Sequence, residues 1–243
     1  MKAVILAAGI ASRLRPLTDH KPKCLLEIGN KCLLERAITG LTVNGIREIV
    51  IVTGYLQEQI ISFVKEKFPE IKVEFIYNEK YASTNNIYSL WLAKERVLTH
   101  EVLLLDSDIL FDPALVKALL DSPDKNCLAL AVHPLGEEEI KVIPDGHNRV
   151  REISKTCSIE QAIGESIGIE KMSADYIAAL YRELDQMILR ENLDNIFYEA
   201  AFERLIPQGK TFGIVSTEGL FSIELDTVED FKAATDRIPA QLL

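Results

Sequence analysis

Two pairs of carboxylates stand two residues apart in this chain of 243 residues. Asp106 and Asp108 lie in LLLDSDILF, directly after a run of leucines, and Glu224 and Asp226 lie in SIELDTVEDF. Residues two apart in an extended backbone point to the same side, so each pair can present both carboxylates to one ligand. Such pairs suit Mg²⁺, a hard cation that takes oxygen ligands and is bound by protein carboxylates together with substrate phosphates. The alternative is that each pair forms a turn or helix cap, with Thr227 as a good N-cap candidate.

A turn of small residues with cations nearby follows the first apolar segment, in VILAAGIASRLRPLTDHKPK. Ala7, Ala8 and Gly9 are followed by Arg13 and later by Lys23. One glycine does not make a G-x-G-x-x-G dinucleotide loop, and no Gly-Lys-Ser/Thr follows to make a P-loop. Small residues nevertheless let a base or phosphate approach backbone amides, and Arg and Lys bind phosphate oxygens. A solvated surface loop is the alternative, but the position after a first strand favours a phosphate-binding loop.

The formal net charge of −10 restricts the partners of the chain. A nucleic-acid footprint requires a basic stripe or face, so we expect no nucleic-acid partner. An acidic surface also repels phosphates, so a phosphate site must be a local basic island. Residues 13–23 form such an island, with two Arg and two Lys against Asp19 alone.

The cysteines and apolar segments indicate where the protein resides. Cys24, Cys32, Cys127 and Cys157 show no paired C-x-x-C spacing, which favours free thiols in a reducing compartment over a zinc site. The apolar run before Gly9 is too short for a signal peptide, and no run approaches the ~18 residues that span a membrane. We therefore expect a cytoplasmic protein without a membrane span.

Buried strands and helices alternate in the first half of the sequence. Strands are predicted at 2–6, 48–53, 72–77 and 102–105, and helices at 33–43, 57–68, 85–97 and 113–120. Continuous apolar strands between helices indicate a parallel sheet covered on both faces. We therefore predict an α/β protein with a Rossmann-like three-layer α/β/α fold and a mostly parallel central sheet. Ligands of such sheets bind at the carboxyl ends of the strands. The small-residue loop at 7–9 and the Asp106–Asp108 pair both follow strands of this half, so both lie at such ends.

The pattern changes after residue 125. Strands are predicted at 127–133, 140–143, 150–153, 166–169, 211–215 and 221–224, and helices at 174–189, 197–205 and 228–237. We expect these strands to form a smaller antiparallel lobe. No repeat, low-complexity segment or linker interrupts the chain, so residues 1–243 are predicted to be a single domain with two halves.

These stretches together resemble the nucleotidyltransferase superfamily that includes the sugar-1-phosphate nucleotidyltransferases. LAAGIASRLRPLTDHKPKCLLEIGNKCLLE, residues 6–35, matches its LAAGxGxRLxPLT…PKxLLxI signature, except that Ala11 stands at the usual second glycine. GIREIVIVTGY, LLLDSD and ELDTVED extend the match over the whole chain. YNEKYASTNNIYSL, residues 77–90, is similar to bacterial phosphocholine cytidylyltransferases, and residues 137–155 with 164–169 look like enzymes that activate 2-aminoethylphosphonate with CTP.

The resemblance implies a role for each group of residues. A nucleotide site would comprise Leu6, Ala7, Ala8, Gly9, Ser12 and Asn85. Arg13 and Lys23 would be the catalytic cations on the triphosphate. Asp108, Asp226 and Glu224 would hold Mg²⁺, with Asp106 as a neighbour. Lys155, Glu165, Glu139 and Tyr198 would bind the acceptor, and Glu199 would line the same side unless Tyr198 and Glu199 form an ordinary helix start. Residues 1–125 would then form the nucleotide-binding half and 126–243 the acceptor-binding half.

The implied reaction is Mg²⁺-dependent transfer of CMP from CTP to a small phosphorylated or phosphonylated alcohol, of the phosphocholine or 2-aminoethylphosphonate type. The alternative is a sugar-1-phosphate nucleotidyltransferase that uses UTP, dTTP or GTP. Two other classes of protein are alternatives. One is a glycosyltransferase, because Asp106-Ser107-Asp108 is formally a DxD motif, and the other is a regulatory subunit that binds nucleotide without turnover. The tryptophan that phosphocholine enzymes carry near the acceptor strand is missing around Glu138, which argues against choline and leaves a primary amine, a polyol phosphate or a sugar phosphate open as the acceptor. The four histidines fit no ligand spacing and receive no role.

Overall fold

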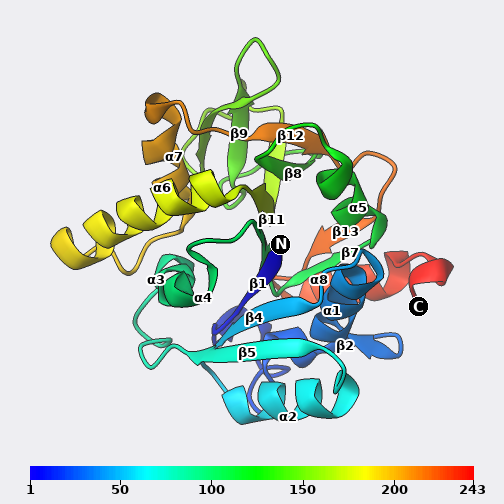
Figure 1. The fold of residues 1–243 in the computed structure, drawn as a ribbon. Coiled ribbons are helices and arrows are strands. Elements are labelled where there is room, and N and C mark those ends of the chain that lie inside the picture. Colours follow the sequence, from blue (N-terminus) through cyan, green and yellow to red (C-terminus); the bar gives the residue numbers. More distant parts are fainter.

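A nine-stranded mixed sheet forms the centre of the computed structural model, which describes residues 1–243 (Figure 1). Its parallel part consists of β1 (Lys2–Ala7), β4 (Glu48–Thr53), β5 (Lys72–Tyr77) and β6 (Val102–Asp106), in the order β6-β1-β4-β5. The register of β1 places Leu6 beside Asp106 and Ala7 beside Thr53. The loop after β1 and the Asp106–Asp108 segment after β6 therefore leave the sheet at the same edge, as predicted.

Helices cover both faces of this sheet, which confirms the three-layer fold. One apolar face, which includes Ile5 and Ile51, packs on α1 (Leu33–Val43), α2 (Gln57–Lys67) and α5 (Ala114–Asp121). The other face, which includes Val4 and Val52, packs on α3 (Asn86–Leu92), α4 (Lys94–Val97), α6 (Ala174–Asp185) and α7 (Glu199–Leu205). Neighbouring residues of each strand face opposite layers, so both faces must be apolar, and this explains the uninterrupted apolar strands.

The strands of the second half extend the same sheet. They are β8 (Cys127–Ala131), β9 (Lys141–Pro144), β10 (Val150–Ser154), β11 (Gly164–Met172) and β12 (Gly213–Ser216). β11 pairs antiparallel with β6, β8 and β9, and β9 pairs antiparallel with β10. The predicted antiparallel pairing is thus present, although β12 pairs parallel with β8. β11 is longer than predicted because its first residues pair with β9 and β8 and its last residues pair with β6.

Two short strand pairs were not predicted. β7 (Ile109–Phe111) pairs with β13 (Ser222–Glu224), and β2 (Glu27–Ile28) pairs with β3 (Lys31–Cys32). Together with α8 (Val228–Arg237) they enclose a small core that includes Ile28, Leu110 and Leu225. In this way the end of the chain packs against its beginning.

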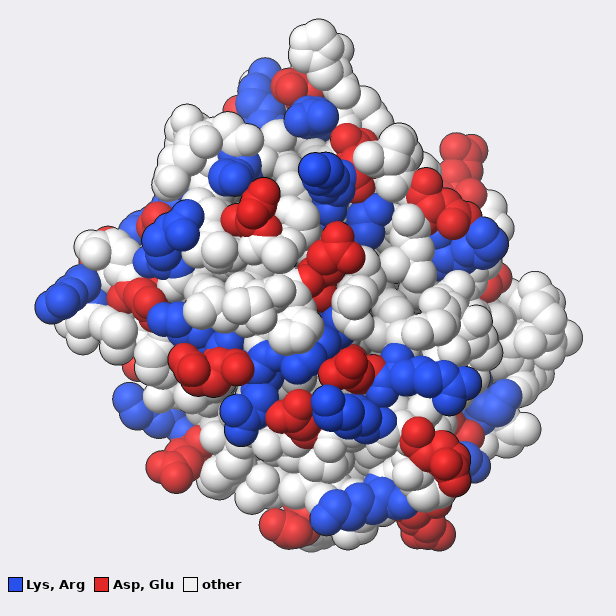
Figure 2. Space-filling view, viewed as in Figure 1, with Lys and Arg blue, Asp and Glu red and all other residues white.

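Several boundaries differ from the predicted ones. The helix predicted at 85–97 is divided at Ala93 into α3 and α4, and α6 continues through one π-helical turn, Gln186–Arg190. Short 3₁₀ turns lie at Ser12–Leu14, Lys23–Leu25, Ile206–Gln208 and Ala240–Leu242. None of the helices combines the length and apolarity needed to cross a bilayer. All four cysteines are free thiols, and Lys, Arg, Asp and Glu mix across the face shown in Figure 2.

Candidate active site

A cavity of about 1180 Å³ lies where β1 and β6 end. Residues from both halves of the chain line it. From the predicted nucleotide side these are Leu6, Ala7, Ala8, Gly9, Arg13, Lys23 and Asn85. From the predicted metal and acceptor sets they are Asp108, Glu224, Asp226, Glu139, Lys155 and Glu165. The structure thus brings together thirteen of the fifteen residues selected from the sequence, and Ser12 and Tyr198 are the two outside the lining.

Three carboxylates gather at one point of this cavity. Asp108, Glu224 and Asp226 each offer an oxygen within 4.8 Å of the others. The β7–β13 pair causes this convergence, because Glu224 pairs with Ile109 and the backbone N–H of Leu225 donates to the carbonyl of Asp108 at 3.1 Å. The Thr227 side chain caps α8 in a capping box with Asp230, which leaves the Asp226 carboxylate free to face the cavity.

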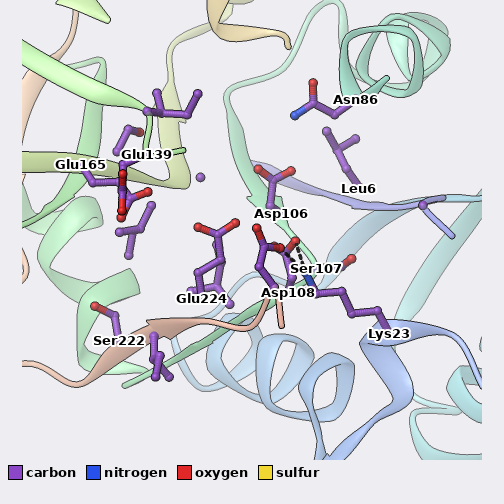
Figure 3. Close-up of a pocket in the computed structure, with 18 of the residues that line it drawn as sticks. Leu6, Lys23, Asn86, Asp106, Ser107, Asp108, Glu139, Glu165, Ser222 and Glu224 are labelled. Atoms are coloured by element: carbon purple, nitrogen blue, oxygen red, sulfur yellow. Dashed lines mark hydrogen bonds and ion pairs between the residues drawn. The ribbon is translucent and has the colours of Figure 1, made fainter. Parts of the chain in front are cut away.

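Lys23 and Arg13 meet these carboxylates. Lys23 Nζ lies 2.8 Å from Asp108 Oδ2 and 2.8 Å from Asp226 Oδ1, and its side chain is only 11% exposed (Figure 3). The Arg13 guanidinium also donates to Asp226 and lies 3.8 Å from Glu138. Two cations of the segment after β1 therefore face Asp108, which lies between β6 and β7, and Asp226, which lies between β13 and α8.

The charges shift one another's pKa values. Burial disfavours the ammonium of Lys23, but Asp108 and Asp226 outweigh burial and raise the pKa of Lys23. Burial favours the neutral form of Asp226, yet Lys23 and Arg13 hold the pKa of this carboxyl below its usual range. Partial desolvation of Glu224, together with the charges of Asp108 and Asp226, raises the pKa of its carboxyl. The site is therefore a cluster of acids that attracts cations.

Residues of the first loop are held in place by its neighbours. Thr18 Oγ1 donates to the carbonyl of Ala11 at 2.9 Å, and Tyr55 Oη donates to the carbonyls of Thr18 and Asp19 at 3.0 and 2.8 Å. Ala11 itself adopts a left-handed conformation with φ 52° and ψ 52°. That conformation costs a side chain energy and costs glycine none, which explains why the superfamily signature has glycine at this position. Ser12 starts the following 3₁₀ turn and is exposed.

The segment after β5 forms the opposite wall of the nucleotide side. Asn85 is the N-cap of α3, and its side chain accepts from the backbone N–H of Asn86 at 2.7 Å. Asn78 is buried and donates to Thr84 Oγ1 and Ser89 Oγ at 3.2 and 3.1 Å. This network fixes the wall that Asn85 lines.

The acceptor side carries both signs of charge. Lys155 Nζ lies 3.1 Å from Glu138 Oε2 and 4.5 Å from the centre of the Phe197 ring. Glu139 Oε2 accepts the backbone N–H of Gly136 at 2.8 Å. Figure 3 shows Glu139 and Glu165 near each other, across the cavity from Lys23. The single predicted cation of this side therefore pairs with Glu138 and shares the cavity lining with Glu139 and Glu165.

Sequence reasoning gave no role to one residue of this side and named another only as part of its lining. His133, which was given no role, lines the cavity with Nε2 2.8 Å from Glu165 Oε2. Glu199 lines it as well, whereas its neighbour Tyr198 is fully buried and donates to Asp106 Oδ2 at 3.1 Å. No spacing signals His133. The sequence offered both Tyr198 and Glu199 for this side, and the structure places Glu199 in the cavity lining and Tyr198 outside it.

Gly168 is another residue to which the sequence assigned no role. It lines the cavity with φ +70°, and a Cβ there would approach Asp106 Oδ2 to 2.6 Å. Only glycine fits, because both the backbone conformation and the close carboxylate exclude a side chain. Asp106 is thus held between Gly168 and Tyr198, and burial together with Asp108 raises its pKa well above the usual range. This places Asp106 apart from the three-carboxylate cluster.

The cluster has the donors that a divalent cation requires. Carboxylate oxygens are the ligands that hard divalent cations take. Asp108 Oδ1 is buried without a hydrogen-bond partner, and Asp108, Glu224 and Asp226 stand close enough to share one ion. The residues present therefore fit a divalent metal ion.

The fold and the site together define an enzyme of nucleotidyl transfer. The model of the nucleotidyl transferase family matches residues 2–138, more than half of the chain. The chain therefore belongs to the nucleotidyl transferase family, as the resemblance in its sequence predicted.

Individual relatives agree with this assignment. The chain is 45% identical over 108 residues to a choline-phosphate cytidylyltransferase of Streptococcus pneumoniae, a match that spans 44% of this chain and 44% of that relative. It is 28% identical over 261 residues to a CTP:phosphoglutamine cytidylyltransferase of Campylobacter jejuni, spanning 98% and 100% of the two chains. The solved structure of the CTP:phosphocholine cytidylyltransferase from Streptococcus pneumoniae superposes with a TM-score of 0.81 at 26% identity, covering 98% and 99%.

Proposed function

We propose that this protein transfers CMP from CTP to a small phosphorylated or phosphonylated alcohol, with Mg²⁺ as cofactor and pyrophosphate as the second product. The observation that carries the proposal is the convergence of Lys23 and Arg13 on Asp108 and Asp226 in one cavity. The relatives named above act on CTP, which favours this nucleotide. The chain matches less than half of the first relative's length, so the acceptor rests on the site and on the experiment below.

The transfer needs no strong general base. An oxygen of the acceptor's phosphate or phosphonate attacks the α-phosphorus of CTP, a new O–P bond forms, and the bond from the α-phosphorus to the β-phosphate oxygen breaks. Pyrophosphate leaves with that electron pair, and no proton has to move because the nucleophile is already an anion. The barrier is the repulsion between two anions, so catalysis consists of positioning and charge neutralisation.

Each residue has a part in this scheme. Backbone groups of Ala7, Ala8 and Gly9 approach the nucleotide, and Asn85 lies on the facing wall. Arg13 and Lys23 bind the triphosphate, and Lys155 binds the acceptor phosphate. Asp108, Glu224 and Asp226 would hold Mg²⁺, which would supply positive charge to the phosphates. Asp106 accepts a hydrogen bond from the Tyr198 hydroxyl. It therefore does not join Asp108 as the second metal ligand of a DxD motif, which the glycosyltransferase alternative requires.

A pyrophosphate-release assay tests the proposal. The protein is incubated with each nucleoside triphosphate, Mg²⁺ and a panel of phosphorylated acceptors that includes hexose 1-phosphates. We expect release with CTP and a small alcohol phosphate, and loss of release with EDTA. Release with hexose 1-phosphates alone would replace the proposal with the sugar-nucleotide alternative, and nucleotide binding without any release would refute transfer.

A matched pair of variants tests the metal assignment. Asp108→Asn should lower the Mg²⁺-dependent rate by a factor on the order of 10². Asp112→Asn is the control, because Asp112 is outside the cavity lining and an asparagine can still accept the backbone N–H of Ala114. Equal rates for Asp108→Asn and Asp112→Asn would contradict the assignment.

A further inference from the structure

One carboxylate at the acceptor side of the cavity has no partner. Glu199 begins α7, is only 4% exposed and lines the cavity. Its Oε2 atom is buried and makes no hydrogen bond. A buried oxygen without a donor is energetically costly, so such an atom points to a group that arrives with a ligand.

The other carboxylates of this side are already engaged. Glu139 accepts the backbone N–H of Gly136, and Glu165 pairs with His133. Asp106 accepts the hydroxyl of Tyr198. Glu199 is therefore the carboxylate of this side that retains a buried oxygen for a new hydrogen bond.

Aromatic side chains do not form a cage here. Tyr81 and Phe197 are the only Tyr, Phe or Trp residues in the cavity lining, and the face of Phe197 is covered by the Lys155 ammonium. Trp91 lies elsewhere, where its Nε1 donates to Asp185 at 2.9 Å. A trimethylammonium group is bound by aromatic faces and has no N–H to give to Glu199. The site therefore lacks the recognition that such a group requires.

The charges favour an ammonium over a hydroxyl as the missing donor. On the acceptor side of the cavity lining, three carboxylates, Glu138, Glu139 and Glu165, stand beside the two basic groups Lys155 and His133. Burial raises the pKa of Glu199 to about 7, although its own backbone N–H and the charge of Lys155 act in the opposite direction. A protonated primary amine offers three donors and the charge that would keep this carboxyl ionised.

We propose, on the basis of the proposed function, that the acceptor carries a protonated primary amine and that Glu199 binds it. Lys155 then binds the phosphate end of the same molecule, and Glu199 binds the amine end. The acceptor is in this case a phosphorylated or phosphonylated primary amine. It is neither a phosphorylated quaternary ammonium compound nor a polyol phosphate that lacks a cationic group.

Wild-type protein gives the first test. With CTP and Mg²⁺, kcat/KM is measured for phosphoethanolamine, 2-aminoethylphosphonate, phosphocholine and glycerol 3-phosphate. We expect one of the two primary amines to exceed phosphocholine and glycerol 3-phosphate by about tenfold or more, the scale of a charge-assisted hydrogen bond. A preference for phosphocholine or glycerol 3-phosphate would overturn the inference and leave CMP transfer intact. No release with any acceptor would remove the proposed function and this inference with it.

Glu199→Gln gives the second test. It should raise the KM of the primary amine by about tenfold or more, with the KM of CTP within about twofold of wild type. Glu203→Gln is the matched control, one turn further along α7 and outside the cavity lining, where a glutamine oxygen can still accept the N–H of Ile153. An equal loss with amine and with glycerol 3-phosphate, or an equal effect of both variants, would overturn the role of Glu199.

Discussion

The ammonium of Lys23 lies 2.8 Å from Asp226 Oδ1, across 203 residues of the chain. Lys23 comes from the first loop and Asp226 from the segment between β13 and α8, so the contact joins the beginning of the fold to its end. Asp108 accepts from the same ammonium. The lysine thus neutralises the carboxylates that could hold a metal ion, and phosphates that enter the cavity meet a cation whose position is already fixed.

Replacing this lysine should stop the reaction while leaving nucleotide binding detectable. We expect Lys23→Met to reduce the turnover number by a factor on the order of 10² or more, because it removes a positive charge that faces the reacting phosphates. The measurement is the rate of pyrophosphate release at saturating CTP. Lys72→Met serves as control, since Lys72 is exposed and pairs with Glu48 on the surface. A Lys23→Met protein with half of the wild-type rate would contradict the role given to Lys23.

The parallel half of the fold could be predicted from the sequence because its signals are local. Apolar β-branched runs ended by turn residues mark β4 and β5 at the predicted bounds, and the Asn44-Gly45 stop marks the end of α1. A strand was predicted at the position of β13, but its pairing with β7 was not, because β7 has only three residues and lies 111 or more residues away in the sequence. That pair is what brings Glu224 beside Asp108.

The candidate site follows the same division. Arg13, Lys23, Asp108 and Asp226 come from long matching segments, and the structure brings them to one cavity. His133 could not be predicted, since its partner Glu165 lies 32 residues away on another strand. The choice between Tyr198 and Glu199 depends on the angle at which α7 begins, and tertiary packing sets that angle.

Ala11 gives a prediction about the first loop. Its left-handed backbone costs an L-residue roughly 1–2 kcal/mol, and glycine avoids that cost but has about 0.4–1 kcal/mol more unfolded-state entropy to lose. Ala11→Gly should therefore leave the free energy of unfolding unchanged or raise it by up to about 1.6 kcal/mol, as measured by urea denaturation. Ala8→Gly is the control, because Ala8 is buried and has no positive φ, and it should destabilise. Destabilisation of the same size by both variants would contradict this account of Ala11.

The His133–Glu165 pair should make stability depend on pH. Burial opposes the imidazolium of His133, but the Pro134 carbonyl and Glu165 outweigh it and raise the pKa of His133. Burial raises the pKa of Glu165, although His133 acts against it. Both groups hold protons more tightly in the folded state, so their contribution to stability falls as pH rises from about 4.5, and the His133 part is lost above about 6.5.

A double variant isolates this contribution. His133→Gln combined with Glu165→Gln should show a smaller loss of stability between about pH 5 and pH 8 than the wild type, as read from urea midpoints. His147→Gln, an exposed histidine elsewhere, controls for the loss of a histidine. An unchanged pH dependence in the double variant would show that the pair does not contribute.

Lys141 should position the acceptor side without contacting the acceptor. It is 1% exposed, and its Nζ donates to the backbone carbonyls of Lys155 at 2.6 Å, Glu139 at 3.2 Å and Glu137 at 3.4 Å. One buried ammonium thus ties together the two segments that carry the charged groups of this side. Lys141→Met keeps the length and apolar body of the side chain and removes these bonds, so we expect the acceptor KM to rise about tenfold, with the KM of CTP within about twofold of wild type.

Lys171 separates positioning from stability in this test. It is also buried, at 6% exposure, and its Nζ donates to the carbonyl of Ser122 at 3.0 Å, away from the cavity lining. Lys171→Met should lower the free energy of unfolding, as Lys141→Met does, because both remove hydrogen bonds from a buried ammonium to backbone carbonyls. Only Lys141→Met should change the acceptor KM, because only Lys141 holds Lys155 and Glu139 in register. If both variants raise the acceptor KM equally, the effect is a general loss of stability and Lys141 has no positioning role.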